Sequence, residues 1–295
     1  MKEIFERNSP ARQPSPRKRA ETRTRFPRRH PMCTASWIHF QGGFTLLFNR
    51  DERRDRARGG KPGIIEFPGG KAVAPRDGKA GGTWIFANDA GCAGALLNHY
   101  PQYDADTDVV HDFISRGQLL LKCSRASTPD TLAETLRNTL DSGPFRPFLL
   151  AFFSPEKPPL LWTWDGTRLH PPSTPDPPVT TSSWKSSEVE AARRRAFENR
   201  FPTGQPASPD DLEAFHLGED TPPGPYGVLM DRDDARTVSF TRIDVGPLHV
   251  QMTYRERLSG HRFEAPRRTV LPRRDSTTPS HLPGHRSHHN IRQCP

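Results

Sequence analysis

Apolar and polar positions alternate in short runs along most of the chain, a pattern typical of strands with one buried face. The first two runs, TASWIHF and FTLLFNR at residues 34–40 and 44–50, are separated by a Gln-Gly-Gly segment. A glycine-containing turn between two such runs predicts a β-hairpin. The hairpin would bring Cys33 and the Asn-Arg-Asp run at residues 49–51 to the same edge of a sheet, because its two strands are antiparallel.

Further runs of this kind predict additional antiparallel strands. Residues 53–82 are polar and rich in glycine, so we expect a loop there. The Pro-rich turn between RPFLLAFF and LLWTW predicts a second hairpin. Strands are expected at residues 84–87, 91–98, 146–153, 160–164, 179–183, 226–230, 236–245 and 248–257.

Four segments have the spacing of amphipathic helices and lie between blocks of strands. Thr128 and Ser208 are capping residues that each precede a proline suited to the first helical position. An arginine-rich helix is expected to begin after a cap at Ser186 or Ser187. The block order predicts an α+β fold, because a parallel sheet requires strands and helices to alternate. The expected helices are at about 108–122, 129–140, 188–201 and 208–217.

Positive charge is concentrated at both ends of the chain. Residues 1–31 carry a formal charge of +7 and residues 258–295 carry +5, against +9 for the whole chain, which leaves −3 for residues 32–257. Both ends have little apolar surface to bury, so we expect disordered tails around one folded domain at 32–257. A nucleic-acid-binding protein would carry its basic residues on a folded face with aromatic side chains, so no nucleic-acid partner is predicted.

The remaining composition bears on location and cofactors. No run approaches about 18 apolar residues, so no transmembrane segment is expected. The N-terminal region lacks the apolar stretch of a secretory signal. The four cysteines form no C-x-x-C or zinc-binding pattern. We therefore predict a reduced, cytoplasmic protein without a metal or other cofactor.

Cys33 directly follows an internal methionine, Met32, and this is the strongest chemical signal in the chain. If translation starts at Met32 instead of Met1, removal of the methionine leaves a thiol and an α-amine on one residue. The amine titrates near about 7.7–8.0 and the thiol near about 8.5, so the amine could accept the thiol proton at neutral pH. The alternative is an unprocessed cysteine that packs within a strand.

Several short motifs follow one another in a characteristic order: MCTASW, FNRDE, GGTW, GALLNHYP, SRG, SSW and RTVSFT. The ordered set resembles the NRDE family, which is named for the residues that stand here as Asn49-Arg50-Asp51-Glu52 and includes proteins like transport and Golgi organisation protein 2. That family in turn resembles the N-terminal nucleophile hydrolases, in particular choloylglycine hydrolases and penicillin V acylases. The resemblance covers about residues 32–257 and implies a four-layer αββα sandwich with Cys33 at a sheet edge.

The resemblance also implies a catalytic set. Cys33 would be the nucleophile, and Arg50 would favour its thiolate. Asp51 would hydrogen-bond the α-amine, and Asn98 would face the oxyanion. Arg50 and Asp51 are adjacent here rather than three residues apart, so either Asp51 or Glu52 could take the amine-facing place. Without a function, Arg50 and Asp51 would form an ordinary ion pair and Asn98 would be a turn residue.

Other positions are candidates for contact with a substrate. Trp84 in the GGTW motif either packs in the core, as most strand tryptophans do, or lines a ligand pocket. His99 lies next to the expected oxyanion residue. Ser183 belongs to a serine pair that stands where the related hydrolases have a later asparagine. A final active-site arginine would be Arg236 or Arg255.

Two functions of different classes follow from these residues. The first is an amidohydrolase with an N-terminal cysteine nucleophile, acting on a small-molecule amide or acyl substrate. The second is a non-catalytic carrier or trafficking protein that uses the same fold for a hydrophobic ligand such as haem or a lipid. Substitution of Cys33 separates them, because an enzyme would lose activity and a carrier would keep its ligand affinity.

Overall fold

The computed structural model describes residues 33–100, 112–202, 204, 206, 208–219 and 223–274. The basic extension predicted at residues 1–31 lies outside the described residues, as do residues 275–295 of the predicted tail.

One antiparallel sheet contains both arms of the predicted N-terminal hairpin. β1 (Cys33–Phe40) and β2 (Gly43–Arg53) pair with Cys33 opposite Arg50. β9 (Val179–Thr181) pairs with the other side of β1 and places Thr181 opposite Cys33. The sheet is completed by β10 (Ala235–Val245), β11 (His249–Ser259), β12 (Arg262–Phe263) and β13 (Arg267–Pro272). Its order is β12-β11-β10-β2-β1-β9, with β13 also paired to β11.

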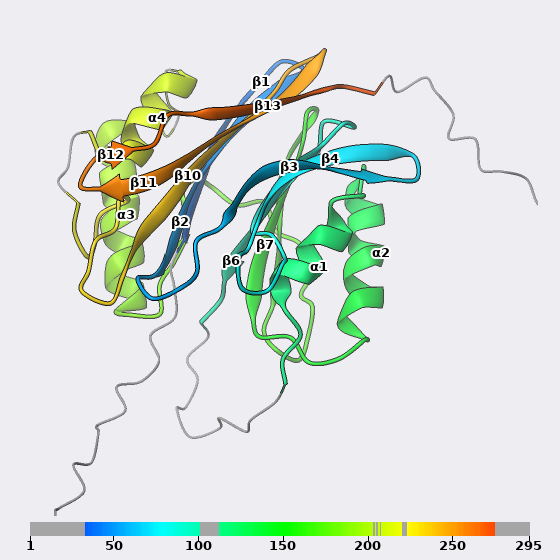
Figure 1. The fold of residues 1–295 in the computed structure, drawn as a ribbon, viewed down its shortest axis with the longest axis horizontal. Helices are drawn as coiled ribbons and strands as arrows, with labels where there is room; N and C mark the ends of the chain where they lie inside the picture. The colour runs from blue at the N-terminus through cyan, green and yellow to red at the C-terminus, as the bar shows by residue number, and fades with distance from the viewer. Residues whose placement is uncertain are drawn as a thin grey trace, which may run out of the picture.

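The second antiparallel sheet consists of six strands in chain order (Figure 1). They are β3 (Gly60–Phe67), β4 (Gly70–Arg76), β5 (Ile85–Asn88), β6 (Ala93–Asn98), β7 (Phe148–Ser154) and β8 (Lys157–Trp164). The small residues of β6 allow close packing. A Cβ atom at Gly94 would lie only 2.4 Å from the ring of Phe86, so the strand has no room for a side chain there.

A pair of helices covers the outer face of each sheet (Figure 1). α1 (Arg116–Cys123) and α2 (Pro129–Leu140) pack on the six-stranded sheet through an apolar cluster that includes Leu119 and Leu136. α3 (Ser186–Arg200) and α4 (Pro209–Leu217) pack on the other sheet through Phe197 and Phe215. A third cluster lies between the sheets and includes Trp37. These layers confirm the predicted α+β fold and the four-layer αββα sandwich.

Two of the four described helices, α2 and α4, begin at the capping residues that the sequence predicts. Thr128 caps α2 through reciprocal hydrogen bonds with Thr131, and the Ser208 hydroxyl caps α4. α3 instead begins after Lys185, which has a left-handed backbone (φ 46°) and no side-chain cap. α1 begins only after Ser115, so residues 112–115 are not helical. The expected start near 108 lies outside the described residues.

Three further sequence predictions are wrong. Residues 53–82 are not a loop, because they contain the β3–β4 hairpin, whose glycines and exposed polar side chains conceal the alternation of strands. Residues 226–230 form no strand and contribute only an isolated bridge. The tail predicted from residue 258 is folded up to residue 274 at least, because β13 pairs with β11 and buries Leu271 between the sheets.

Candidate functional site

Cys33 is the first residue of β1 and faces the core between the two sheets. Its partners in register are Arg50 on β2 and Thr181 on β9. Burial, together with the charge of Asp51, raises the pKa of the Cys33 thiol to about 12. The backbone N–H of Asp51 and the charge of Arg50 oppose this shift of the pKa without cancelling it. With its peptide bond to residue 32 in place, Cys33 is therefore a protonated thiol at neutral pH.

The Arg50 side chain lies on the same face of the sheet as Cys33. It donates to Asp77 at 2.7 Å and to Glu52 at 3.3 Å, and its guanidinium carbon lies 4.1 Å from the centre of the Trp84 ring. The Trp84 ring thus packs against the Arg50 guanidinium, and the two carboxylates fix the orientation of the Arg50 side chain. This arrangement holds a positive charge directly across from the Cys33 strand position.

The NRDE motif divides between the two faces of its sheet, because neighbouring strand residues point in opposite directions. Arg50 and Glu52 face the space between the sheets. Asn49 and Asp51 face the helices, where the Asn49 amide donates to the carbonyl oxygens of His216 (2.8 Å) and Val228 (3.0 Å). The motif thereby links the Cys33 side of the sheet to the helices behind it.

Asp51 forms a buried ion pair with Arg193 of α3, at 3.2 Å. Neither side chain is exposed to solvent. The Thr237 hydroxyl donates to the other Asp51 oxygen at 2.6 Å. Burial raises the pKa of Asp51, and the Arg193 charge acts against that shift. Arg193 also donates to the hydroxyl oxygens of Thr34 (2.6 Å) and Thr180 (3.2 Å), so it secures the strand ends on both sides of Cys33.

Asn98 ends β6, opposite Phe148 of β7. Its neighbour Tyr100 makes a hydrogen bond with the Asn98 side chain, and burial raises the pKa of the Tyr100 hydroxyl. Burial lowers the pKa of Arg116, while the charges of Tyr100 and Cys33 act in the opposite direction. The charge of Cys33 therefore acts on both Tyr100 and Arg116.

The predicted substrate contacts lie in different places. Trp84 is buried beneath Arg50, so it belongs both to the core and to the surroundings of Cys33. Burial lowers the pKa of His99. The charge of Asp165 acts to raise this pKa, and the charge of His170 acts to lower it. Ser183 is half-buried in the turn between β9 and α3, two residues beyond the partner of Cys33.

One family model matches nearly half of the chain. Residues 32–172 match the model of the family described as Transport and Golgi organisation 2. The predicted resemblance to the NRDE family is thereby confirmed over this part of the chain. No curated protein has a significant match to this sequence.

The fold of this chain is similar to that of solved hydrolase structures. One is a Caenorhabditis elegans N-acylethanolamine-hydrolyzing acid amidase ortholog, with 11% identity over 73% of this chain and 93% of that chain and a TM-score of 0.50. Another is penicillin V acylase from Agrobacterium tumefaciens, with 14% identity over 77% of this chain and 84% of that chain and a TM-score of 0.39. The first likeness concerns the fold alone, and it agrees with the predicted four-layer αββα sandwich.

Sequence reasoning overlooked two arginines near Cys33, of which Arg193 is buried and Arg116 is half-buried. Arg193 lies four residues after Val189 and four before Phe197, on the buried stripe of α3, and this spacing was the available signal. Arg116 opens α1 within the SRG motif. Of the two arginines that the sequence offered, Arg236 lies opposite Glu52 in register and donates to the Leu258 carbonyl oxygen at 2.7 Å.

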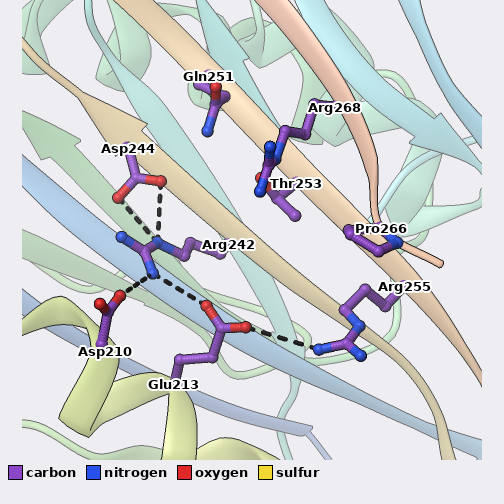
Figure 2. Close-up of a pocket in the computed structure, with 9 residues that line it drawn as sticks. All are labelled: Asp210, Glu213, Arg242, Asp244, Gln251, Thr253, Arg255, Pro266 and Arg268. Atoms are coloured by element: carbon purple, nitrogen blue, oxygen red, sulfur yellow. Dashed lines mark hydrogen bonds and ion pairs between the residues drawn. The ribbon is translucent and has the colours of Figure 1, made fainter. Parts of the chain in front are cut away.

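Arg255 lines a hollow of about 410 Å³ on the outer face of the first sheet, beside α4 (Figure 2). Strand alternation places this face opposite the one that carries Cys33. At one end of the hollow, Arg242 donates to Asp210, Glu213 and Asp244 at 2.8–3.0 Å, and these carboxylates raise its pKa (Figure 2). The hollow is lined by Asp210, Glu213, Arg242, Asp244, Gln251, Thr253, Arg255, Pro266 and Arg268.

Two further features bear on partners. Within the described ranges, no group of three or more His, Cys, Asp or Glu side chains is arranged to hold a metal ion. No helix in the described part of the chain is both long and apolar enough to cross a membrane.

Proposed function

We propose that this NRDE protein is an amidohydrolase whose nucleophile is an N-terminal Cys33, acting on a small-molecule amide or related acyl compound. The observation that carries the proposal is the position of Cys33 at the start of β1, in register with Arg50, within an N-terminal nucleophile hydrolase fold. The name of the nematode neighbour describes hydrolysis of an acyl amide, which supports the same substrate class here.

The proposal requires a chain that begins at Cys33. A free α-amine would then lie beside the thiol and act first as its base, with Arg50 favouring the thiolate. The backbone nitrogen of Cys33 lies in the plane of the sheet, so a carboxylate on either face could orient the amine. Asp51 is assigned this role from the helix side, and Glu52 from the inner side is the alternative.

In the reaction, the Cys33 sulfur forms a bond to the acyl carbon and the carbonyl electron pair moves to oxygen. The oxyanion role of Asn98 stays a prediction from the family resemblance, as do the substrate contacts of Trp84, His99 and Ser183. Collapse of the oxyanion breaks the carbon–nitrogen bond, and the leaving amine takes the proton from the Cys33 ammonium. Water then releases the acyl group from the thioester.

We also propose a cytoplasmic location. Cys33, Cys92 and Cys123 are free thiols in the structure, which suits a reducing compartment.

Cys33→Ala and Cys33→Ser are expected to lower amide turnover by at least about a thousandfold, because no other group supplies the nucleophile. The measurement is hydrolysis of a panel of N-acyl amides by the natively processed protein, with thermal unfolding recorded for each variant. Cys123→Ala is the matched control, because Cys123 is a buried free cysteine that packs against α2. Turnover that survives in both Cys33 variants would refute the proposal and favour a ligand carrier.

A further inference from the structure

Thr181 lies directly beside Cys33 and carries a hydroxyl that no described group engages. It is the last residue of β9 and pairs in register with Cys33. Residues directly opposite each other on antiparallel strands point to the same face, with Cβ atoms about 4.5–5.5 Å apart. Thr181 is 4% exposed, and its Oγ1 atom is buried without a hydrogen-bond partner among the described residues.

The neighbouring threonine hydroxyls, in contrast, have hydrogen-bond partners. Thr34 and Thr180 bond to each other and to Arg193 on the helix side of the sheet, and Thr237 bonds to Asp51. Thr181 points the other way, since Val179, two residues earlier, packs in the core between the sheets. A valine at position 181 would serve the strand equally well, and it would leave no polar group buried without a partner.

A second donor near Cys33 also lacks an acceptor. Trp84 carries the Arg50 guanidinium on its ring, and its Nε1–H is buried without a partner among the described residues. Buried donors without acceptors are unfavourable unless a ligand supplies the missing atom. The inner face of the sheet around Cys33 therefore presents hydrogen-bond donors for an oxygen atom that the described residues do not provide.

We propose that the Thr181 hydroxyl donates a hydrogen bond to the substrate oxygen that becomes an oxyanion when Cys33 attacks, an inference that rests on the proposed function. The sulfur–carbon bond forms, the carbonyl π pair moves to oxygen, and that oxygen accepts the Thr181 proton in a hydrogen bond without taking it. When the oxyanion collapses, the carbonyl reforms and the amine leaves with the proton of the Cys33 ammonium. The Thr181 hydroxyl therefore assists only the attack on a carbonyl carbon, where an oxyanion forms.

The Thr181 hydroxyl is better placed than the Asn98 side chain to reach an oxygen beside the Cys33 sulfur. Leu97 of β6 packs between the sheets, whereas Leu96 packs toward the helices. Because successive strand residues point to opposite faces, the Asn98 side chain lies on the helix side of the sheet, as Leu96 does. The Asn98 side chain bonds with Tyr100. Thr181, in contrast, is on the same face as the sulfur and on the adjacent strand.

The test uses two reagents that differ in whether an oxyanion forms. Iodoacetamide is attacked at a tetrahedral carbon and develops no oxyanion, whereas p-nitrophenyl acetate is attacked at a carbonyl carbon and does. Both rates are measured on the natively processed full protein, with mass spectrometry locating the label on Cys33. The variants are Thr181→Val, which removes the hydroxyl at nearly constant volume, and Thr181→Ser, which keeps it.

Thr181→Val is expected to acylate about a hundredfold more slowly, the usual effect of one lost oxyanion donor, and to alkylate within about twofold of the wild-type rate. Thr181→Ser is expected to acylate at close to the wild-type rate. Thr181→Ala provides the same comparison if thermal unfolding shows that the valine variant is damaged.

Equal loss of both rates would assign Thr181 a structural role and overturn the inference. Unchanged acylation in Thr181→Val would overturn it as well, while leaving the proposed function intact. If wild-type Cys33 is alkylated but never acylated, the proposed function itself fails, and the oxyanion role fails with it.

Discussion

Arg193→Leu is expected to lower the free energy of unfolding by about 3–5 kcal/mol, because it leaves a buried carboxylate without its partner. Arg193 and Asp51 are both fully buried, 3.2 Å apart. The substitution also removes the donors that Thr34 and Thr180 accept from α3. The measurement is urea unfolding followed by far-ultraviolet circular dichroism, with the linear extrapolation to water compared between proteins.

Arg194→Leu is the matched control, because Arg194 is the exposed neighbour on the same helix. Its unfolding free energy is expected to stay within about 0.5 kcal/mol of the wild-type value. The double variant Arg193→Leu with Asp51→Leu should recover most of the loss, since it removes both charges together. A single variant as stable as the control would mean that the ion pair does not hold α3 to the sheet.

The stability of the protein is expected to fall as the pH is lowered from 6.5 toward 3, with His216 as a main cause. His216 is fully buried, and burial together with the Arg193 charge lowers its pKa from 6.5 to about 3. Between these values the unfolded chain binds a proton at His216 and the folded protein does not. Unfolding is therefore favoured by about 1.4 kcal/mol for each unit of falling pH, or roughly 5 kcal/mol across the window.

His216→Gln isolates this contribution. The amide nitrogen of Gln can take the place of Nε2, which lies 2.5 Å from the Ser36 hydroxyl oxygen, and it does not titrate. Urea unfolding at intervals from pH 4.5 to 6.5 should give a slope about 1.4 kcal/mol per pH unit shallower in the variant than in the wild type. Identical slopes would show that His216 becomes protonated in the folded protein.

The local rules of the sequence predicted the part of the fold nearest the site. The Gln-Gly-Gly turn and the alternation around it were enough to pair Cys33 with Arg50, because a short hairpin fixes its own register. Thr128 and Ser208 marked the starts of α2 and α4 for a similar reason, since a cap acts on the next three residues.

The missed features depend on contacts between distant segments. β13 begins with two arginines and resembles a basic tail, and only its pairing with β11 shows that Leu271 is buried. Arg193 looks like one of several exposed helix arginines until Asp51 is placed beneath it. Thr181 lies beside Cys33 only because β9 pairs with β1, and no local sequence pattern predicts that pairing.

The most direct test of the central claim is the alkylation rate of Cys33 against pH on natively processed protein whose first residue has been determined by intact mass and N-terminal sequencing. We predict that the mature chain begins at Cys33 and that its thiol titrates below the usual value of about 8.5, because an ammonium and Arg50 lie beside it. A chain that continues through Met32 into Cys33, with a thiol that resists alkylation until the pH nears its raised pKa of about 12, would contradict the nucleophile role.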